Sequence, residues 1–391
     1  MFRVTDANGV ERYNSRINQR KMPVAVVNDF RLTLISDTPF MGESEGQTLS
    51  STVYLAPIGT GNRITLYEGN VRQWQIRSTA QISVAVPSTL FRLFDLYAYW
   101  TGSAVALETV NWNQSTGTIT NVTAASPAVV TSTAHGLSNG DLVGISGIVG
   151  TVGTNATQGL NGTVWVVANK TANTFEAQGS DTSGLAYTSD GTWYLSATRA
   201  TALTTQDGTY VKTGDATRRY LGTSMTRGTS GQTEQNFGGV DELTKWLLWN
   251  YYNRFEVQLR YSDSTDSYTY TTATFRPTNG RGKFARIEVV IGVTEDQVEA
   301  ETMAVASHSG GLFTYQGIGV SGTGNILTNS AQIFQGGNNL NVRAIYRKLQ
   351  AAGFHYLTWL EKSDATGTAT WYGDAGAPTD LQSGFRVKIR C

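Results

Sequence analysis

A glycine-rich stretch is the first candidate for chemistry, because Gly317, Gly319 and Gly322 match the G-x-G-x-x-G pattern of dinucleotide-binding sites. Such a site requires the glycines to follow a strand and to open a helix, so that backbone amides point at the pyrophosphate. Residues 323–325 continue as Thr-Gly-Asn, and no helical pattern follows them. We therefore expect a glycine-rich β-turn here and no bound cofactor.

The three histidines, His135, His308 and His355, stand in unlike sequence contexts. No two of them are four residues apart or form an H-x-H pair, and no Asp or Glu partners for a zinc ion can be named. His135 precedes Gly136 in a predicted turn, and His355 lies among aromatic residues with Glu361 nearby. We expect hydrogen-bonded structural histidines, in the core or at an interface, and no metal site.

Pairs of carboxylates are the remaining candidates for acid–base chemistry. They are Asp95 with Glu108, Asp263 with Asp266, and Glu295 with Asp296. Glycosidases place two carboxyls about 5–10 Å apart across a cleft, and spacing along the chain cannot establish that separation. Neither a G-x-S-x-G elbow nor a Walker lysine motif occurs. The sequence therefore predicts no catalytic residue and favours a protein that is not an enzyme.

Composition and charge restrict the partners. The 30 Lys and Arg residues balance the 30 Asp and Glu residues, so no overall field favours nucleic acid. Charged residues make up only 15% of the chain, below the ~25% usual for soluble domains. Gly, Thr, Ser and Asn take their place, which suits an assembled extracellular shell or fibre better than a cytosolic enzyme.

The single cysteine, Cys391, excludes an intrachain disulfide and a cysteine-based metal site, and its role stays open. No apolar run approaches the roughly 18–20 residues of a membrane span. Residues 1–6 lack the apolar stretch of a signal peptide. We expect a protein that folds without oxidation and has no membrane span.

The pattern of short apolar segments predicts a mainly β protein with a multi-domain sandwich or barrel architecture. Segments rich in Val, Ile, Thr and aromatic residues are separated by Gly-containing turns, and residues 81–86 alternate strictly. Residues 240–255 differ, because Leu243, Trp246, Leu247 and Asn250 follow i, i+3, i+4, i+7 spacing. We expect one amphipathic helix near 240–255, and residues 294–306 are a candidate for a second, short helix.

A shift in composition indicates the domain organisation. From about residue 115 to residue 193 the chain is dominated by Thr, Gly, Val, Ala and Asn, with very few charges. We expect residues 115–193 to form an inserted small β-barrel. Residues 46–114 and 194–391 would form one interrupted β-rich main domain, and residues 1–45 a separate N-terminal segment.

The inserted segment carries a specific order of turn motifs. They are His135-Gly136, Asn139-Gly140-Asp141, Asn161-Gly162, Asn173-Thr174-Phe175 and Gly191-Thr192-Trp193. This order resembles the small β-barrel related to the first-catalytic-cysteine half-domain of ubiquitin-activating enzymes, a module that recurs as an insertion in phage tail and other virion proteins. The segment has no cysteine, so the resemblance implies no catalytic role.

The flanking regions are similar to tail-fibre-like proteins of tailed bacteriophages. The stretches that carry this similarity are residues 215–223, 249–254, 268–276, 290–296, 353–361 and 370–374. The resemblance implies a virion component that is assembled in the host bacterial cytoplasm, associated with the tail and commonly trimeric. Residues 1–45 would then be its virion-docking segment.

We accordingly expect a tail fibre or tail-fibre attachment protein that acts as a homotrimer and contacts other virion proteins of the tail or portal region. Obligate interfaces commonly bury about 2,000 Å² or more and are apolar. The candidate interface residues are Trp246, Trp249, Tyr251, Tyr252, Trp359, Trp371 and Tyr372.

Three other functions stay open. The first is a head fibre or capsid decoration protein, which uses the same chemistry elsewhere on the particle. The second is a polysaccharide-cleaving tailspike, although no regular solenoid period is present. The third is a carbohydrate-binding receptor module that contacts host surface glycan, in which Trp165 or Tyr187 would stack on sugar.

Overall fold

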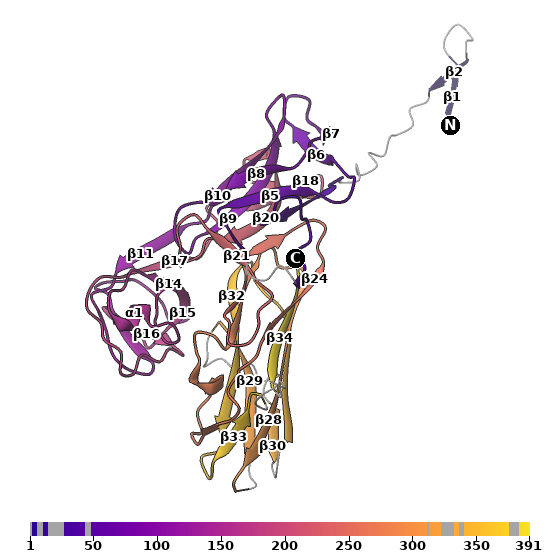
Figure 1. The fold of residues 1–391 in the computed structure, drawn as a ribbon. Coiled ribbons are helices and arrows are strands. Elements are labelled where there is room, and N and C mark those ends of the chain that lie inside the picture. Colours follow the sequence, from indigo (N-terminus) through magenta and orange to yellow (C-terminus); the bar gives the residue numbers. More distant parts are fainter. Residues whose placement is uncertain are drawn as a thin grey trace.

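The chain is built from strands almost throughout. The computed structural model describes residues 2–5, 11–14, 27–43, 48–310, 313–321, 332–335, 340–374 and 383–391 (Figure 1). Within these ranges the helical elements include a single turn, α1 (Thr151–Thr154), and a 3-10 turn, η2 (Thr278–Gly280). The predicted mainly β fold is confirmed.

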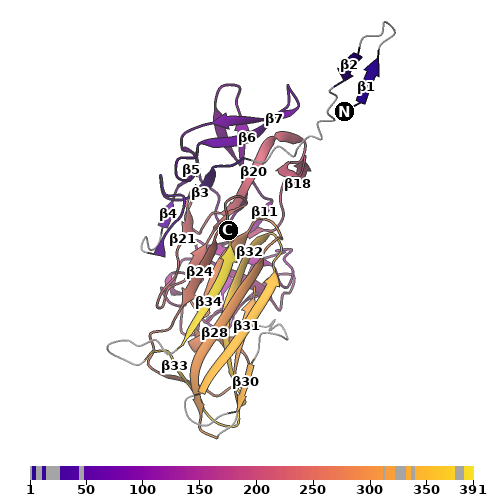
Figure 2. The ribbon, with the colours of Figure 1, turned by 90° about the vertical axis from the view of Figure 1, so that its right-hand side faces the viewer.

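The first two strands, β1 (Phe2–Thr5) and β2 (Glu11–Asn14), form an antiparallel pair. Much of the predicted segment 1–45 lies outside the described residues. Its later part does not form a separate unit, because β3 (Phe30–Thr33) pairs with β5 (Thr52–Pro57) and lies beside it in Figure 2.

The upper body combines a six-stranded sheet, a three-stranded sheet and a hairpin. The six-stranded sheet has the order β10-β9-β20-β19-β18, with β23 paired to β20. Its strands are β9 (Leu93–Trp100), β10 (Val105–Asn111), β18 (Leu203–Gln206), β19 (Thr209–Lys212), β20 (Asp215–Met225) and β23 (Leu248–Asn250). The other strands are β3, β5 (Thr52–Pro57) and β8 (Ile82–Ala85), and the hairpin of β6 (Arg63–Glu68) with β7 (Gln73–Ser78).

A core of its own fills the upper body, with Phe30, Leu55, Leu66 and Phe94 among its buried residues. Strands β9 and β20 pair directly, with Tyr97 opposite Tyr220, although about 120 residues of chain separate them. The sheet therefore joins the two stretches of chain that flank the inserted segment.

The inserted segment forms a seven-stranded sheet in the order β11-β17-β14-β15-β16-β13-β12. The strands are β11 (Gln114–Thr118), β12 (Asn121–Val122), β13 (Ala128–Thr131), β14 (Leu142–Ser146), β15 (Thr163–Ala168), β16 (Thr174–Gln178) and β17 (Thr192–Ser196). Its core is separate and includes Ile145, Trp165 and Phe175. The chain enters through β11 and leaves through β17, and these two strands pair with Gln114 opposite Ser196. We refer to this unit as the side barrel.

The lower body consists of two antiparallel-rich sheets that share one hydrophobic core. The first has the order β30-β29-β32-β27-β22-β21-β4, with β26 paired to β32. Its strands are β4 (Thr48–Ser50), β21 (Thr233–Gln235), β22 (Thr244–Trp246), β26 (Arg276–Pro277), β27 (Arg286–Ile291), β29 (Phe313–Val320), β30 (Gln332–Gln335) and β32 (Gly353–Ser363).

The second sheet of the lower body has the order β24-β34-β28-β33-β25, and β31 pairs with the other edge of β28. Its strands are β24 (Glu256–Tyr261), β25 (Tyr268–Tyr270), β28 (Gln297–His308), β31 (Leu340–Leu349), β33 (Ala369–Tyr372) and β34 (Gly384–Arg390). Ile287, Val298, Trp359 and Val387 are among the core residues contributed by the two sheets.

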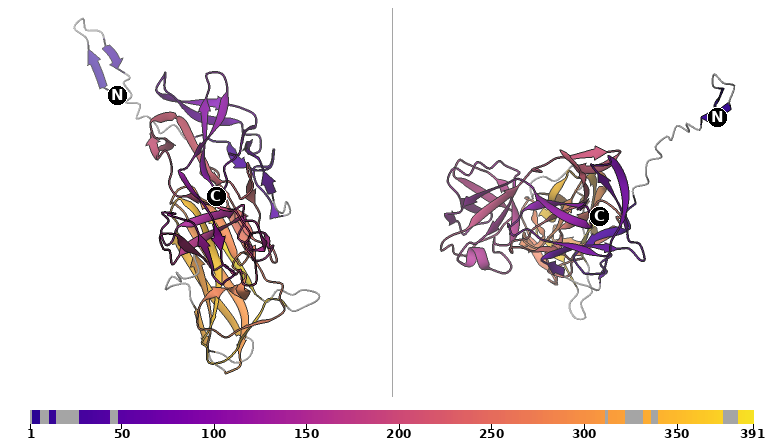
Figure 3. Two further views of the ribbon diagram at one scale, coloured as in Figure 1. Left: turned by 90° about the vertical axis from the view of Figure 1, so that its left-hand side faces the viewer. Right: turned by 90° about the horizontal axis from the view of Figure 1, so that it is seen from above.

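The upper and lower bodies are stacked along one axis, which makes the molecule elongated (Figure 2). The side barrel lies beside this axis, as the view from above makes clear (Figure 3). Close contacts between the three bodies hold them in this arrangement.

Glycines allow the side barrel to approach the rest of the chain closely. The ring of Phe91 lies against Gly144 of β14, where an added Cβ would be 2.1 Å from the ring. The loop around Gly228 likewise meets Gly162, and a Cβ on Gly228 would lie 2.8 Å from the Cα of Gly162. Side chains at these glycines would push the two bodies apart, because real Cβ contacts are not this short.

A buried arginine adds a polar contact to the same junction. The guanidinium carbon of Arg286 lies 5.1 Å from the ring centroid of Trp165 in the side barrel and 4.5 Å from that of Tyr356 in the lower body. Glu288 accepts a 2.6 Å hydrogen bond from the same guanidinium, which compensates its charge. Arg286 thus contacts both bodies at once.

A second arginine ties the upper body to the lower one. Arg199, just after the chain leaves the side barrel, donates from Nε to buried Asp95 of β9 at 2.8 Å. It also donates to the backbone oxygen of Gly292 in the lower body and stacks on Trp112, 4.5 Å from the ring centroid. Burial raises the pKa of Asp95 in spite of the neighbouring guanidinium, so the contact with Arg199 is what favours the ionised carboxylate.

The helix predicted near 240–255 is wrong. These residues form β22, β23 and the connection that leads to β24. Residues 244–250 are buried on both sides of the chain, so the i, i+3, i+4 spacing reflected a continuous apolar run, and such a run does not distinguish a buried strand from a helix. The aromatic residues of this stretch favour the extended state.

The short helix considered at 294–306 is also absent, because these residues lie mostly in β28. Val298, Ala300 and Ala304 face the core, whereas Glu299, Glu301 and Met303 do not. That alternation has the period of a strand, and the helical expectation overlooked it.

Candidate binding surface

Four strands of the lower body present a regular outward face. In β24, β34, β28 and β31 every second side chain packs into the core, as Tyr261, Phe385, Thr302 and Ala344 do. The intervening side chains must therefore point to solvent on the opposite side of the sheet. We call this surface the outward face.

The printed strand registers define the positions of the outward face. Arg260 of β24 lies opposite Arg386 of β34, which lies opposite Glu301 of β28, which lies opposite Ile345 of β31. The parallel rows contain Gln258, Lys388, Glu299 and Arg347 on one side, and Gly384, Met303 and Arg343 on the other.

Basic residues outnumber acidic ones on the outward face. The basic residues are Arg260, Arg343, Arg347, Arg386, Lys388 and Arg390, and the acidic residues are Glu256, Glu299 and Glu301. The face is therefore a positively charged surface with carboxylates embedded in it, on a chain whose formal net charge is zero.

The embedded carboxylates are held by neighbouring strands. Glu301 accepts from both Arg343 and Arg386, and Glu299 pairs with Arg347 at 3.0 Å. Burial by itself would raise the pKa of Glu301, but the hydrogen bonds from the two arginines outweigh it, so this pKa lies below its usual value. Glu301 therefore stays ionised and fixes the two guanidiniums.

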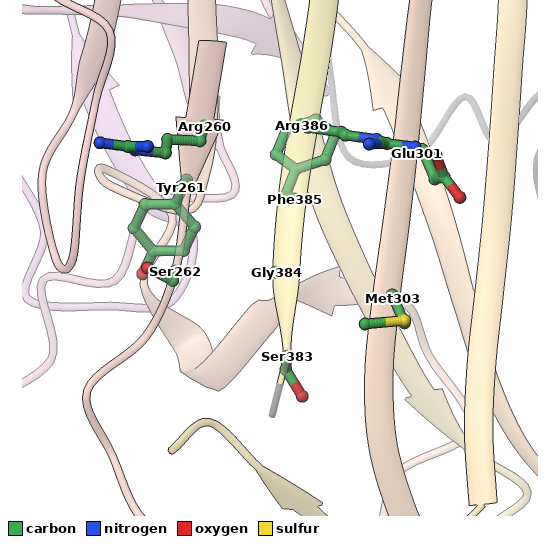
Figure 4. Close-up of a pocket in the computed structure, with 9 residues that line it drawn as sticks. All are labelled: Arg260, Tyr261, Ser262, Glu301, Met303, Ser383, Gly384, Phe385 and Arg386. Carbon is green, nitrogen blue, oxygen red and sulfur yellow. Dashed lines mark hydrogen bonds and ion pairs between the residues drawn. The ribbon is translucent and has the colours of Figure 1, made fainter. Parts of the chain in front are cut away.

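A notch interrupts the outward face at Gly384 (Figure 4). Its volume is about 380 Å³. Its lining residues are Arg260, Tyr261, Ser262, Glu301, Met303, Ser383, Gly384, Phe385 and Arg386. We call this hollow the Gly384 notch, because the missing side chain of Gly384 leaves it open.

The walls of the Gly384 notch have different chemistry. Figure 4 shows Met303 reaching toward β34, with Arg260 and Arg386 extending to opposite sides. Arg260 pairs with Glu43 and Arg386 with Glu301. The arrangement offers an apolar recess between two guanidiniums, which can hold a compact group and direct hydrogen bonds to anionic substituents.

The four predicted interface tryptophans are buried within one chain. Trp246, Trp249, Trp359 and Trp371 are each at most 1% exposed. Trp249 donates from Nε1 to the backbone oxygen of Arg390 at 3.2 Å. Because the chain covers all four indoles itself, their burial does not need a neighbouring subunit, and they are not surface residues as the trimer interface requires.

The three predicted interface tyrosines are partly buried. Tyr251 packs edge-on against Tyr252 and Tyr210, with ring centroids 4.7 Å and 5.2 Å away. Tyr252 lies under the guanidinium of Arg219, whereas Tyr372 lies apart from them on β33. The structure therefore brings Trp249, Tyr251 and Tyr252 together, and it places the other predicted interface residues on strands of the lower body.

The glycine motif and His135, both considered in the sequence as candidates for chemistry, lie within elements of the fold. The expected β-turn is wrong for Gly317 and Gly319, which lie inside β29; no described helix follows them, and Gly322 lies outside the described residues. The imidazole of His135 accepts from the backbone nitrogen of Leu137 at 3.0 Å and packs edge-on against Phe175.

Five of the six carboxylates in the predicted pairs form ion pairs with basic side chains. Asp95 pairs with Arg199, and Glu108 with Lys212 and Arg218. Asp263 pairs with Arg281, and Glu295 and Asp296 both pair with Arg254. Asp266 differs, because a hydrogen bond with Asp374 and the charge of that neighbour raise its pKa.

Within the described ranges, no group of three or more His, Cys, Asp or Glu side chains could hold a metal ion. The described helical segments include none long and apolar enough to span a membrane.

Comparisons with known proteins do not identify the chain. No protein-family model matches it, and no curated protein does. A chain in the structure of infectious bursal disease virus Gx strain aligns over 88% of this chain and 71% of the viral chain, at 13% identity and a TM-score of 0.22. The structure of the mosquito-larvicidal Cry4Aa toxin of Bacillus thuringiensis aligns over 87% of this chain and 49% of the toxin chain, at 8% identity and a TM-score of 0.19. Similarity this weak carries no argument about this chain.

Sequence reasoning missed Arg260, Gly384 and Arg386. A signal was present, because apolar residues occupy every second position of residues 256–261 and 384–390, with mostly polar or charged residues between them, which is typical of a strand with one solvated face. What the alternation alone does not give is the register that places these two strands beside β28.

Proposed function

We propose that this chain is a structural component of a tailed-bacteriophage virion, a tail fibre or tail-fibre attachment protein that acts as a homotrimer and is not an enzyme. The observation that carries the proposal is the elongated unit formed by the stacked upper and lower bodies, with the side barrel docked beside them (Figure 2). The resemblance of residues 115–193 to a module found in virion proteins supports the same assignment.

The junctions between the bodies fit a load-bearing part better than an enzyme with moving domains. Phe91, Arg199 and Arg286 each make contacts between bodies that are buried or partly buried. Breaking such contacts leaves a cavity or an uncompensated charge, which costs about 3–5 kcal/mol each. A rigid extended unit of this kind is suited to projecting from a particle.

The test is to locate the chain on phage particles. Antibodies raised against the side barrel, residues 115–193, would be bound to purified particles and imaged by electron microscopy. We expect label on the tail or at the portal region. Label distributed over the capsid would favour a head fibre or decoration protein instead, and intact particles that carry none of this chain would rule out the proposal.

A further inference from the structure

We propose that the outward face binds an acidic polysaccharide, with one carboxylated sugar unit in the Gly384 notch. The inference deepens the proposed function and rests on it, because host attachment is what would bring such a glycan to this surface. The observations that support it all lie on the outward face.

The first support is the glycine within a strand. Glycine weakens the interior of a strand, and it often marks a place where a ligand or another backbone approaches closely. A Cβ added to Gly384 would have its nearest neighbour, the backbone oxygen of Tyr261, 3.9 Å away. The described chain would therefore accept a side chain at this position, and the glycine leaves room for an external group beside the strand.

The second support is the charge of the outward face. Its basic residues exceed its acidic ones, and Arg260 and Arg386 flank the notch. Their side chains are 58% and 49% exposed, so both guanidiniums can reach a bound ligand. Guanidinium groups bind carboxylates through paired hydrogen bonds, which a neutral ligand would not exploit.

The third support distinguishes a saccharide from a nucleic acid. Glu299 and Glu301 lie in the middle of the basic surface, and Glu301 is held ionised. They would repel a dense row of phosphates, whereas a sugar chain can donate hydroxyl hydrogens to carboxylates and offer its own carboxylates to arginines. The mixture of charges therefore fits a ligand that has both donors and anionic groups.

The fourth support is the exposed apolar surface beside the notch. Met303 is 50% exposed and Ile345 is 42% exposed, although both belong to a strongly charged sheet face. The C–H faces of sugar rings are apolar and can cover such side chains. The notch volume of about 380 Å³ lies near the lower end of the ~300–1,000 Å³ found for small-ligand pockets, which suits one sugar unit better than a larger group.

The experiment measures binding of the purified full chain to defined polymers at about 0.15 M salt, where screening removes weak long-range attraction. The probes are three carboxylated polysaccharides (polygalacturonate, hyaluronate and polysialate), neutral dextran, and duplex DNA as a polyanion of another class. We expect measurable affinity for at least one carboxylated polysaccharide, and at least tenfold weaker binding to dextran and to DNA.

Two variants test the site. Gly384→Val places a branched side chain in the notch, where its Cβ would lie 3.9 Å from the nearest neighbour, and it puts a strand-favouring residue in a strand, so the variant should fold with an unchanged or higher melting temperature. Arg260→Gln removes one flanking guanidinium. We expect each to weaken binding of the carboxylated polysaccharide at least tenfold.

The matched control is Arg63→Gln on the upper body. The side chain of Arg63 is also 58% exposed, and it pairs with one carboxylate, Asp29, as Arg260 pairs with Glu43. Arg63→Gln removes the same charge from a distant surface. The affinity of this variant for the carboxylated polysaccharide should therefore stay within twofold of that of the unmodified chain.

Three outcomes would overturn the inference. They are failure to bind all three carboxylated polysaccharides, binding of DNA with equal affinity, and a Gly384→Val variant that binds as well as the unmodified chain. Labelling of particles by the antibodies described above is independent of these results. A chain that is located on the tail and binds none of the polymers would refute this inference alone.

Discussion

At the scale of single residues, the buried ionisable groups of this chain form partnered networks that connect separate strands. Glu361 of β32 is an example, because it accepts from the Tyr268 hydroxyl at 2.9 Å, from Arg276 Nε at 2.8 Å and from the backbone nitrogen of Asn279 at 3.2 Å. Desolvation by burial nevertheless dominates and raises the pKa of Glu361 to about 7.

This pKa predicts a dependence of stability on pH. A carboxyl whose pKa is higher in the folded state than in the unfolded state stabilises the fold most at low pH. The contribution of Glu361 should be complete below about pH 4.5, fall as the pH rises to 7, and be lost above that. The whole change is about 3 kcal/mol in the free energy of unfolding.

The measurement is denaturant unfolding of the unmodified chain and of Glu361→Gln between pH 5 and 8. The difference in unfolding free energy between the two should decrease by about 2–3 kcal/mol over that range, because the glutamine does not titrate. A difference that stays constant with pH would show that Glu361 titrates near its ordinary value in the folded chain.

The residue scale also explains why the candidate binding surface could not be predicted. Arg260, Glu301 and Arg386 are neighbours only because three strands far apart in the chain share one register. Alternation in the sequence identifies which side chains share a face of one strand, but it does not say which strands adjoin. Predicting the Gly384 notch would require knowing which strands are neighbours in the sheet.

At the scale of elements, prediction was successful where local chemistry decides the structure. Residues 81–86 alternate and form β8, and the turn glycines Gly140 and Gly162 of the side barrel both have positive φ. Prediction failed for residues 244–250, because a stretch buried on both sides has no polar face to reveal its period. Tertiary burial, not local preference, determined that element.

The docking of the side barrel gives a prediction at this scale. Phe91 is 3% exposed and packs against Gly144 of the side barrel. Replacing it by alanine leaves a cavity at the junction, so Phe91→Ala should lower the free energy of unfolding by about 3–5 kcal/mol.

Phe40→Ala provides the comparison, because Phe40 is 42% exposed and removal of its ring should cost less than ~1.5 kcal/mol. Both would be measured by denaturant unfolding. Equal losses for the two variants would mean that the junction contributes no more to stability than an exposed aromatic does.

At the scale of the whole molecule, the proposed trimer must use surfaces other than the predicted tryptophans. Those indoles belong to the chain's own core. Exposed apolar side chains that remain in the described ranges include Val71 and Ile76 of the upper body and Val149 of the side barrel. These lie on separate bodies, so a trimer contact that covers them would have to involve both the upper body and the side barrel.

The oligomeric state can be measured directly by light scattering of the purified full chain. We expect a mass three times the 42.3 kDa of one chain, unchanged on dilution over about two orders of magnitude, because interfaces of fibre proteins are large. A mass of one chain at every concentration would contradict the homotrimer while leaving a monomeric attachment or decoration role to be tested on particles.

The central claim is that this chain is built into a phage particle, and its copy number in purified virions tests that most directly. Quantitative mass spectrometry with isotope-labelled peptides from residues 192–261 would give the number of chains per portal complex. The account predicts a small multiple of three per particle. Absence of the chain from purified, infectious particles would contradict it.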